Sequence, residues 1–179
     1  SIRACADHIL KNEKQLNAVM LNAGLMATPP SETKEGYEIQ IGVNILGHAL
    51  LVELLFPLIE TTPDARIVTL SSVASNSGRP LQKEMFSLSE NYRPWQTYSN
   101  SKLADLFYAK ALAKYFEKQD INARSIAAHP GGTASQLQIN TRKMGGVGIS
   151  GPFWVYVMKF FGMTIHKGAL SQLMGILSD

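Results

Sequence analysis

The sequence contains the run Leu16-Asn17-Ala18-Val19-Met20-Leu21, which is directly followed by Asn22-Ala23-Gly24. The run is short and apolar and it ends in turn residues, so it predicts a strand that is buried on both faces. Two further runs of this kind follow along the chain, Arg66-Ile67-Val68-Thr69-Leu70 and the segment from Ile121 to Ala128. Three buried strands are therefore expected.

Segments with helical spacing of apolar residues separate these strands. They extend over residues 2–10, from Glu35 to about Ile59, and from Tyr98 to Glu117, and a further helix is expected from Lys167 to Asp179. Strands joined by helix-length connections pair in parallel and carry helices on both faces of the sheet. The sequence therefore predicts an α/β fold with a Rossmann-like, doubly wound parallel sheet, and residues 1–179 form a single domain.

The composition of the chain excludes several classes of protein. Its 179 residues, 45% of them hydrophobic, suffice for one core, and the net charge of +3 is spread along the chain, so no nucleic-acid partner is expected. Cys5 alone cannot form an internal disulfide, which indicates a reducing compartment or indifference to redox state. An intracellular location is expected, either cytoplasmic or peripheral to a membrane. The histidines His8, His48, His129 and His166 lack the spacing of metal ligands, so no metal is expected.

A short segment of small or turn-forming residues follows each predicted strand. Asn22-Ala23-Gly24 follows the first, Ser71-Ser72 the second, and Pro130-Gly131-Gly132 the third. In an open parallel sheet the ligand crevice lies beyond the carboxyl ends of the strands. The three segments are therefore predicted to meet at one site.

Tyr98 and Lys102 lie four residues apart near the start of a predicted helix, so both side chains project from one face. A phenol is a poor acid–base catalyst at neutral pH, and a nearby cation favours the phenolate and lowers the pKa. Taken alone, a Tyr and a Lys at this spacing more often lie on an ordinary exposed helix face than in a catalytic site. Ser72 has no Gly-x-Ser-x-Gly surroundings, which excludes a serine hydrolase of that type.

The order of these motifs resembles the short-chain dehydrogenase/reductase family. Asn22-Ala23-Gly24 is followed by Asn44 on a helix, Ser72 after a strand, Tyr98-x-x-x-Lys102, and Pro130-Gly131. Each motif alone has a structural interpretation, and their order carries the resemblance. The stretch from Gly42 to His48 and its neighbours is similar to the retinol dehydrogenase-like branch. The resemblance is close over about residues 1–136.

The resemblance implies a role for each catalytic residue. Tyr98 would be the general acid in carbonyl reduction and the general base in alcohol oxidation. Lys102 would lower the pKa of Tyr98 and bind the nicotinamide ribose, while Ser72 would bind the substrate oxygen. Asn44 would hold a water in a helix irregularity and link Lys102 to solvent.

The resemblance also implies a nicotinamide cofactor, NADP or NAD, with NADP favoured. The cofactor-binding residues that it implies are Asn22, Ala23, Gly24, Tyr98, Lys102, Pro130, Gly131, Thr133 through its backbone and Ser135 through its hydroxyl.

The chain is expected to hold only part of this fold. By resemblance Ser1 corresponds to a point after the third family strand, so the glycine-rich phosphate loop is absent, and the present strands are the fourth, fifth and sixth. The first of them would have an open edge, and the family's seventh strand would follow the last helix. Gly146 to Gly151 formally matches the dinucleotide fingerprint, but no buried strand precedes it and Pro152 follows, so it is interpreted as a hinge.

Residues 136–166 are predicted to form a flap over the substrate. Its apolar part, Phe153 to Phe161, is too short to span a bilayer and favours a lipophilic substrate. Peripheral membrane contact and an ordinary buried helix are the alternatives.

These observations predict an oxidoreductase that transfers a hydride between a nicotinamide cofactor and a lipophilic alcohol or carbonyl compound. The resemblance leaves a homo-oligomer possible, through the helices that carry Asn44 and Tyr98. One alternative is a non-catalytic fragment or truncated isoform that acts as an interaction protein through its open strand edge. Another is that these residues are the ordered part of a longer chain.

Overall fold

The core of the fold is a parallel sheet. The computed structural model describes residues 1–131, 137, 141, 143–146 and 163–178. Within them, strands β1 (Ala18–Leu21), β2 (Ala65–Leu70) and β3 (Ala123–Ala128) pair in parallel in the order β1-β2-β3. Leu21 pairs with Thr69, and Leu70 with Ala128, so all three strands end at the same edge of the sheet.

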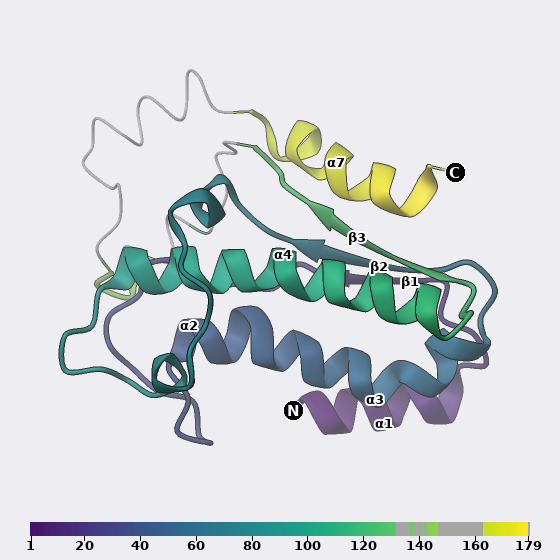
Figure 1. Ribbon diagram of the computed structural model, residues 1–179, viewed down its shortest axis with the longest axis horizontal. Coiled ribbons are helices and arrows are strands. Elements are labelled where there is room, and N and C mark those ends of the chain that lie inside the picture. The colour runs from purple at the N-terminus through teal and green to yellow at the C-terminus, as the bar shows by residue number, and fades with distance from the viewer. Residues whose placement is uncertain (132–136, 138–140, 142, 147–162, 179) are drawn as a thin grey trace.

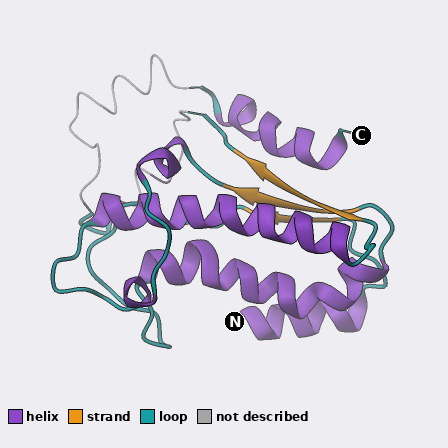
Figure 2. Ribbon diagram, in the orientation of Figure 1, coloured by secondary structure: helices purple, strands orange, loops and turns teal. Residues whose placement is uncertain are grey.

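Helices cover both faces of this sheet. The helices α1 (Ile2–Asn12), α3 (Gly47–Thr61) and α4 (Pro94–Lys118) lie on one side, and α7 (Ile165–Leu177) lies on the other (Figures 1 and 2). Helix α7 contacts β2 and β3. The arrangement confirms the Rossmann-like plan, with β1 at one edge of the described sheet.

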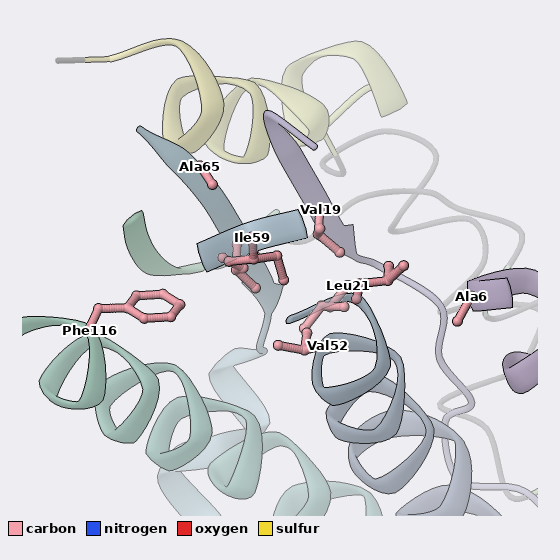
Figure 3. Packing of buried hydrophobic residues seen from close by; sticks show 9 residues of the cluster. Ala6, Val19, Leu21, Val52, Ile59, Ala65 and Phe116 are labelled. Atoms are coloured by element: carbon pink, nitrogen blue, oxygen red, sulfur yellow. The ribbon is translucent and has the colours of Figure 1, made fainter. Parts of the chain in front are cut away.

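The main hydrophobic core lies between the sheet and the helices α1, α3 and α4. Figure 3 shows Val19 and Leu21 of β1 together with Val52 and Ile59 of α3 and Phe116 of α4, all of which are buried. The first five residues of β2 are buried as well, as expected for a central strand that is covered on both faces. This core fixes the sheet against α4, which carries Tyr98.

The helix expected from Glu35 begins later and is interrupted. It consists of α2 (Ile39–Ile41), the π-helical turn η1 (Gly42–Leu46) and α3. Gly36 has a φ of +82°, which breaks the helix, and the Glu38 carboxylate then caps the first turn. This carboxylate accepts hydrogen bonds from the backbone N–H groups of Gln40 at 3.0 Å and Ile41 at 2.7 Å.

Taken together, α2, η1 and α3 (Ile39–Thr61) form the one described segment that is long and apolar enough in composition to cross a membrane. It supplies Val52, Leu55 and Ile59 to the core described above. Core helices meet the same criteria of length and hydropathy, so the pattern alone is weak evidence for a membrane span.

The predicted flap is described only in part. Leu137 packs against a small buried cluster formed by Met26, Ala27 and Tyr98. Thr141 is buried, and its hydroxyl donates a hydrogen bond to the carbonyl oxygen of Met26 at 2.7 Å. Phe153 to Phe161 and most of the predicted hinge lie outside the described residues. The end of the predicted flap belongs to α7, which begins at Ile165.

Candidate active site

The three segments that follow the strands lie at one edge of the sheet. The residues after β1, β2 and β3 are Asn22, Ser71 and His129, and the strand register places them side by side. The backbone N–H of Ser71 donates to the carbonyl oxygen of Ala128 at 2.9 Å, which extends the pairing of β2 and β3 by one residue. The first turns of α4 lie against this edge of the sheet.

Tyr98 lies on the second turn of α4, which begins with Pro94 at its first position. Its side chain is buried, and its ring makes an edge-on contact with Trp95 at a centroid distance of 6.0 Å. Burial raises the pKa of the phenol above its ordinary value, and a hydrogen bond with the Ser72 side chain opposes this rise. The phenol therefore stays protonated at neutral pH.

Ser72 follows β2 and caps the short 3-10 helix η2 (Val73–Ser77), where its hydroxyl oxygen accepts a hydrogen bond from the N–H of Ala74 at 3.2 Å. The end of η2 lies very close to α4, because Gly78 has no side chain. A Cβ on Gly78 would come within 2.5 Å of the Ser99 carbonyl oxygen. This close contact positions Ser72 beside Tyr98.

Lys102 lies one turn after Tyr98 and is 5% exposed. Its ammonium group donates hydrogen bonds to the Leu70 carbonyl oxygen and to the Asp105 carboxylate, each at 2.8 Å. The Ser71 hydroxyl donates to the backbone carbonyl of Lys102 at 2.6 Å and so fixes this part of α4 to the end of β2.

Asn44 lies in the π-helical turn η1 and is fully buried. Its amide accepts a hydrogen bond from the Leu25 N–H at 2.8 Å and donates to the Leu25 carbonyl oxygen and the Ser101 hydroxyl, both at 2.9 Å. Asn44 therefore joins η1, the segment after β1 and α4. The helix irregularity that the resemblance implies at Asn44 is present.

The expected cofactor-binding residues differ in how close they lie to the catalytic residues. Asn22 and Ala23 are exposed, while Gly24 is close to the catalytic residues. A Cβ on Gly24 would lie 3.4 Å from the Asn44 amide oxygen and 3.9 Å from the Lys102 nitrogen.

Of the residues after β3, Pro130 is partly buried and Gly131 has a φ of +72°, a conformation that favours glycine. Thr133 and Ser135 lie outside the described residues.

Two buried titratable residues next to this site were not predicted from the sequence. Asp105 has no exposed side-chain surface and pairs with Lys102. His48 is buried, and neither of its ring nitrogens has a hydrogen-bond partner among the side chains that the structure describes. Burial and the positive charge of Lys102 lower the pKa of His48 to about 4.

A helical wheel places both residues next to predicted site residues, although it does not show that they are buried. Asp105 is one turn from Lys102, and His48 is one turn from Asn44. Across the described ranges, no group of three or more His, Cys, Asp or Glu side chains is arranged to hold a metal ion.

Comparison with known proteins gives the family. The family model for short chain dehydrogenases matches residues 1–145. The chain belongs to the short-chain dehydrogenase family. Within this family it is similar to retinol dehydrogenase 11 of Homo sapiens, with 35% identity over 183 residues that cover 100% of this chain and 53% of that protein. Retinol dehydrogenase 11 of Mus musculus is 40% identical over 184 residues, which cover 100% of this chain and 54% of that protein.

These relatives confirm the retinol dehydrogenase-like branch of the short-chain dehydrogenases. Retinol dehydrogenase 12 of Homo sapiens is 40% identical over 141 residues, 76% of this chain and 42% of that protein. The chain thus spans about half the length of the curated relatives it matches.

Solved structures show the same fold. An uncharacterised protein from Mycobacterium paratuberculosis is 37% identical, with a TM-score of 0.67, over 79% of this chain and 50% of that one. The Pseudomonas aeruginosa RhlG/NADP active-site complex has a TM-score of 0.66 and 18% identity, over 97% of this chain and 64% of that one. At this identity the second structure supports the short-chain dehydrogenase fold alone.

Proposed function

We propose that this chain carries the catalytic part of an NAD(P)-dependent oxidoreductase that interconverts alcohols and carbonyl compounds. The observation that carries the proposal is the meeting of Tyr98, Ser72 and Lys102 at the carboxyl edge of the sheet. Tyr98 and Lys102 are buried, and Ser72 is half-buried and lies beside the phenol. The site therefore combines a proton donor in Tyr98, a hydrogen-bond donor to the substrate oxygen in Ser72, and a cation in Lys102.

The residues of this site fit a nicotinamide cofactor. The Lys102 ammonium has three N–H groups and uses two of them on Leu70 and Asp105, so one is left for a ribose hydroxyl. Gly24 leaves the surface beside Asn44 and Lys102 free of a side chain. NADP is the proposed cofactor, supported by the retinol dehydrogenase-like resemblance, with NAD as the second choice.

The bound cofactor would supply the hydride, and the chain would handle the proton and the substrate oxygen. In carbonyl reduction, the Tyr98 phenol donates its proton to the carbonyl oxygen while the Ser72 hydroxyl donates a hydrogen bond to the same oxygen. In alcohol oxidation the phenolate takes the hydroxyl proton back. The Asn44 amide already has its partners in Leu25 and Ser101, so a relay water would bind to the backbone of η1.

A lipophilic alcohol or aldehyde, such as retinol or its aldehyde, is the proposed substrate class. Several relatives are named retinol dehydrogenases. In this chain Tyr98 belongs to a buried apolar cluster with Met26, and Trp95 and Leu137 pack against this cluster, so apolar side chains adjoin the catalytic residues. Peripheral membrane contact through Phe153 to Phe161, the intracellular location and a homo-oligomer remain predictions from the sequence.

Substitution of Tyr98 tests the proposed function. In the full-length protein, supplied with NADPH and a panel of lipophilic aldehydes and ketones, Tyr98→Phe should lower kcat by about 100-fold or more, because the ring stays and the proton donor is lost. Tyr115→Phe, on the exposed surface of the same helix, is the matched control and should keep wild-type activity. Undiminished activity of Tyr98→Phe would refute the assignment.

A further inference from the structure

The ion pair between Lys102 and Asp105 is a feature of the site that the proposed function does not use. The two side chains lie on successive turns of α4, with 2.8 Å between the ammonium nitrogen and the carboxylate oxygen Oδ2. Their exposed fractions are 7% and 0%, so solvent barely screens the pair. At this distance the carboxylate compensates most of the charge of the ammonium group.

Asp105 depends on Lys102 for its charge compensation. Its second oxygen, Oδ1, is buried and accepts no hydrogen bond from any group that the structure describes. Burial raises the pKa of Asp105 to about 6, and both the charge of Lys102 and its hydrogen bond oppose this rise. The carboxylate is therefore ionised at neutral pH because Lys102 stays beside it.

The other groups around the pair come from neighbouring elements. Tyr98 lies one turn before Lys102 on α4, and α3 contributes His48, whose pKa responds to the charge of Lys102. Strand β2 contributes the Leu70 carbonyl oxygen, and η1 contributes the neutral amide of Asn44. Asp105 is thus the only acid that the described structure pairs with this lysine.

This arrangement changes the effect expected of a Tyr-x-x-x-Lys pair. An uncompensated ammonium four residues away lowers the pKa of a phenol. Here the pKa of Tyr98 is raised, first by burial, and the charge of Asp105 contributes to the rise. A neutralised lysine gives the phenol little help in losing its proton.

We propose that Asp105 is a positioning residue of the site: its carboxylate holds the Lys102 ammonium at the end of β2 and compensates its charge. Through Lys102, Asp105 thereby controls when the Tyr98 phenol gives up its proton. The carboxylate keeps the phenol protonated, which is the form that acts as the acid in carbonyl reduction. This inference rests on the proposed function, since the state of the phenol matters only where it handles a proton.

A titration of Tyr98 tests this proposal without any cofactor. The chain is labelled with ¹³C at the tyrosine Cζ atoms, the Tyr98 signal is identified by its loss in Tyr98→Phe, and its shift is followed by NMR as the pH rises. Asp105→Asn keeps the shape of the side chain and removes the charge, so the Tyr98 pKa should fall by about 1 unit. An unchanged titration in a folded Asp105→Asn variant would overturn the proposal, because a purely structural ion pair predicts that result.

Two further variants complete the test. A double variant shows whether Asp105 acts through Lys102, and a second variant is a control. The double variant Lys102→Met/Asp105→Asn removes both charges, so the Tyr98 pKa should return close to the wild-type value. A value as low as in Asp105→Asn would contradict action through the lysine. Asp64→Asn is the matched control, because Asp64 pairs with Arg66 and Arg124 and not with Lys102, and it should leave the Tyr98 titration unchanged.

The test stays decisive if Asp105→Asn does not fold, because Asp105→Ser also removes the charge and should give the same downward shift.

The outcome of the titration can be separated from that of the proposed function. A shifted titration in a protein with no dehydrogenase or reductase activity would support the role of Asp105 and refute the function. Normal activity with an unshifted titration would do the reverse. In an active protein, the rising limb of kcat for alcohol oxidation should move to lower pH in Asp105→Asn.

Discussion

His48 shows at the residue scale how the site affects the stability of the molecule. Its ring is buried, and burial together with the charge of Lys102 lowers its pKa from 6.5 to about 4. Between these two values the unfolded chain binds a proton that the folded chain does not bind. Stability from His48 is therefore complete above about pH 6.5 and is lost progressively as the pH falls from about 6.5 to about 4.

Substitution of His48 should remove this pH dependence. Asp105 has the opposite effect on the pH dependence of stability, because its raised pKa lets the folded chain bind a proton that the unfolded chain does not bind. This contribution is the same in the wild type and in His48→Gln, so it cancels when the two are compared. Between pH 6 and pH 5, the free energy of unfolding of the wild type should fall by about 1 kcal/mol relative to His48→Gln. Urea unfolding at each pH measures this difference. His166→Gln, at the exposed start of α7, is the control, and an equal slope in all three proteins would show that His48 is not buried as a neutral ring.

The residue scale also shows what the sequence could not reveal. The spacing of Tyr98 and Lys102 was sufficient to propose an acid–base pair, but it carried no information on whether the lysine charge is compensated. That depends on Asp105 being buried toward the lysine, and in the sequence Asp105 is indistinguishable from a solvent-exposed helix residue. Burial is a tertiary property, so local spacing cannot predict it.

At the scale of elements, the π-helical turn η1 couples the site to the fold. Periodicity alone predicted a regular helix from Glu35, because one extra residue in a turn barely disturbs the spacing of apolar side chains. The capping by Glu38 and the turn at Gly36 explain the later start. The irregularity at Asn44 was expected only from the resemblance to the family.

Asn44→Ala should destabilise the fold through this element. The substitution leaves the Leu25 backbone N–H and carbonyl without their side-chain partner, in a region where Asn44 is fully buried. The expected cost is about 1–3 kcal/mol in the free energy of unfolding, measured by urea denaturation. Asn122→Ala, at an exposed position before β3, should cost far less. Equal stability of both variants would show that the Asn44 contacts do not hold η1 in place.

At the scale of the whole molecule, the parallel sheet explains why residues far apart in sequence form one site. The three apolar runs sufficed to predict the strands and their parallel order, since each is long enough for a strand and is separated by a helix. The observed strands begin two residues inside these runs at β1 and β3, where Leu16 and Ile121 instead pack at the edge of the core. Thr133, Ser135 and the segment from Phe153 to Phe161 lie outside the described residues, so their assignments remain predictions from the sequence.

The transfer of hydrogen to the substrate tests the central claim most directly. The full-length protein is supplied with NADPH that carries deuterium at the transferable position, together with a lipophilic aldehyde such as retinal, and the alcohol is analysed by mass spectrometry. The account predicts an alcohol with one deuterium on the former carbonyl carbon from the wild type, and at least about 100-fold less from Tyr98→Phe at equal enzyme concentration. Absence of labelled alcohol with every carbonyl compound and with both NADPH and NADH, or equal labelling by Tyr98→Phe, would contradict it.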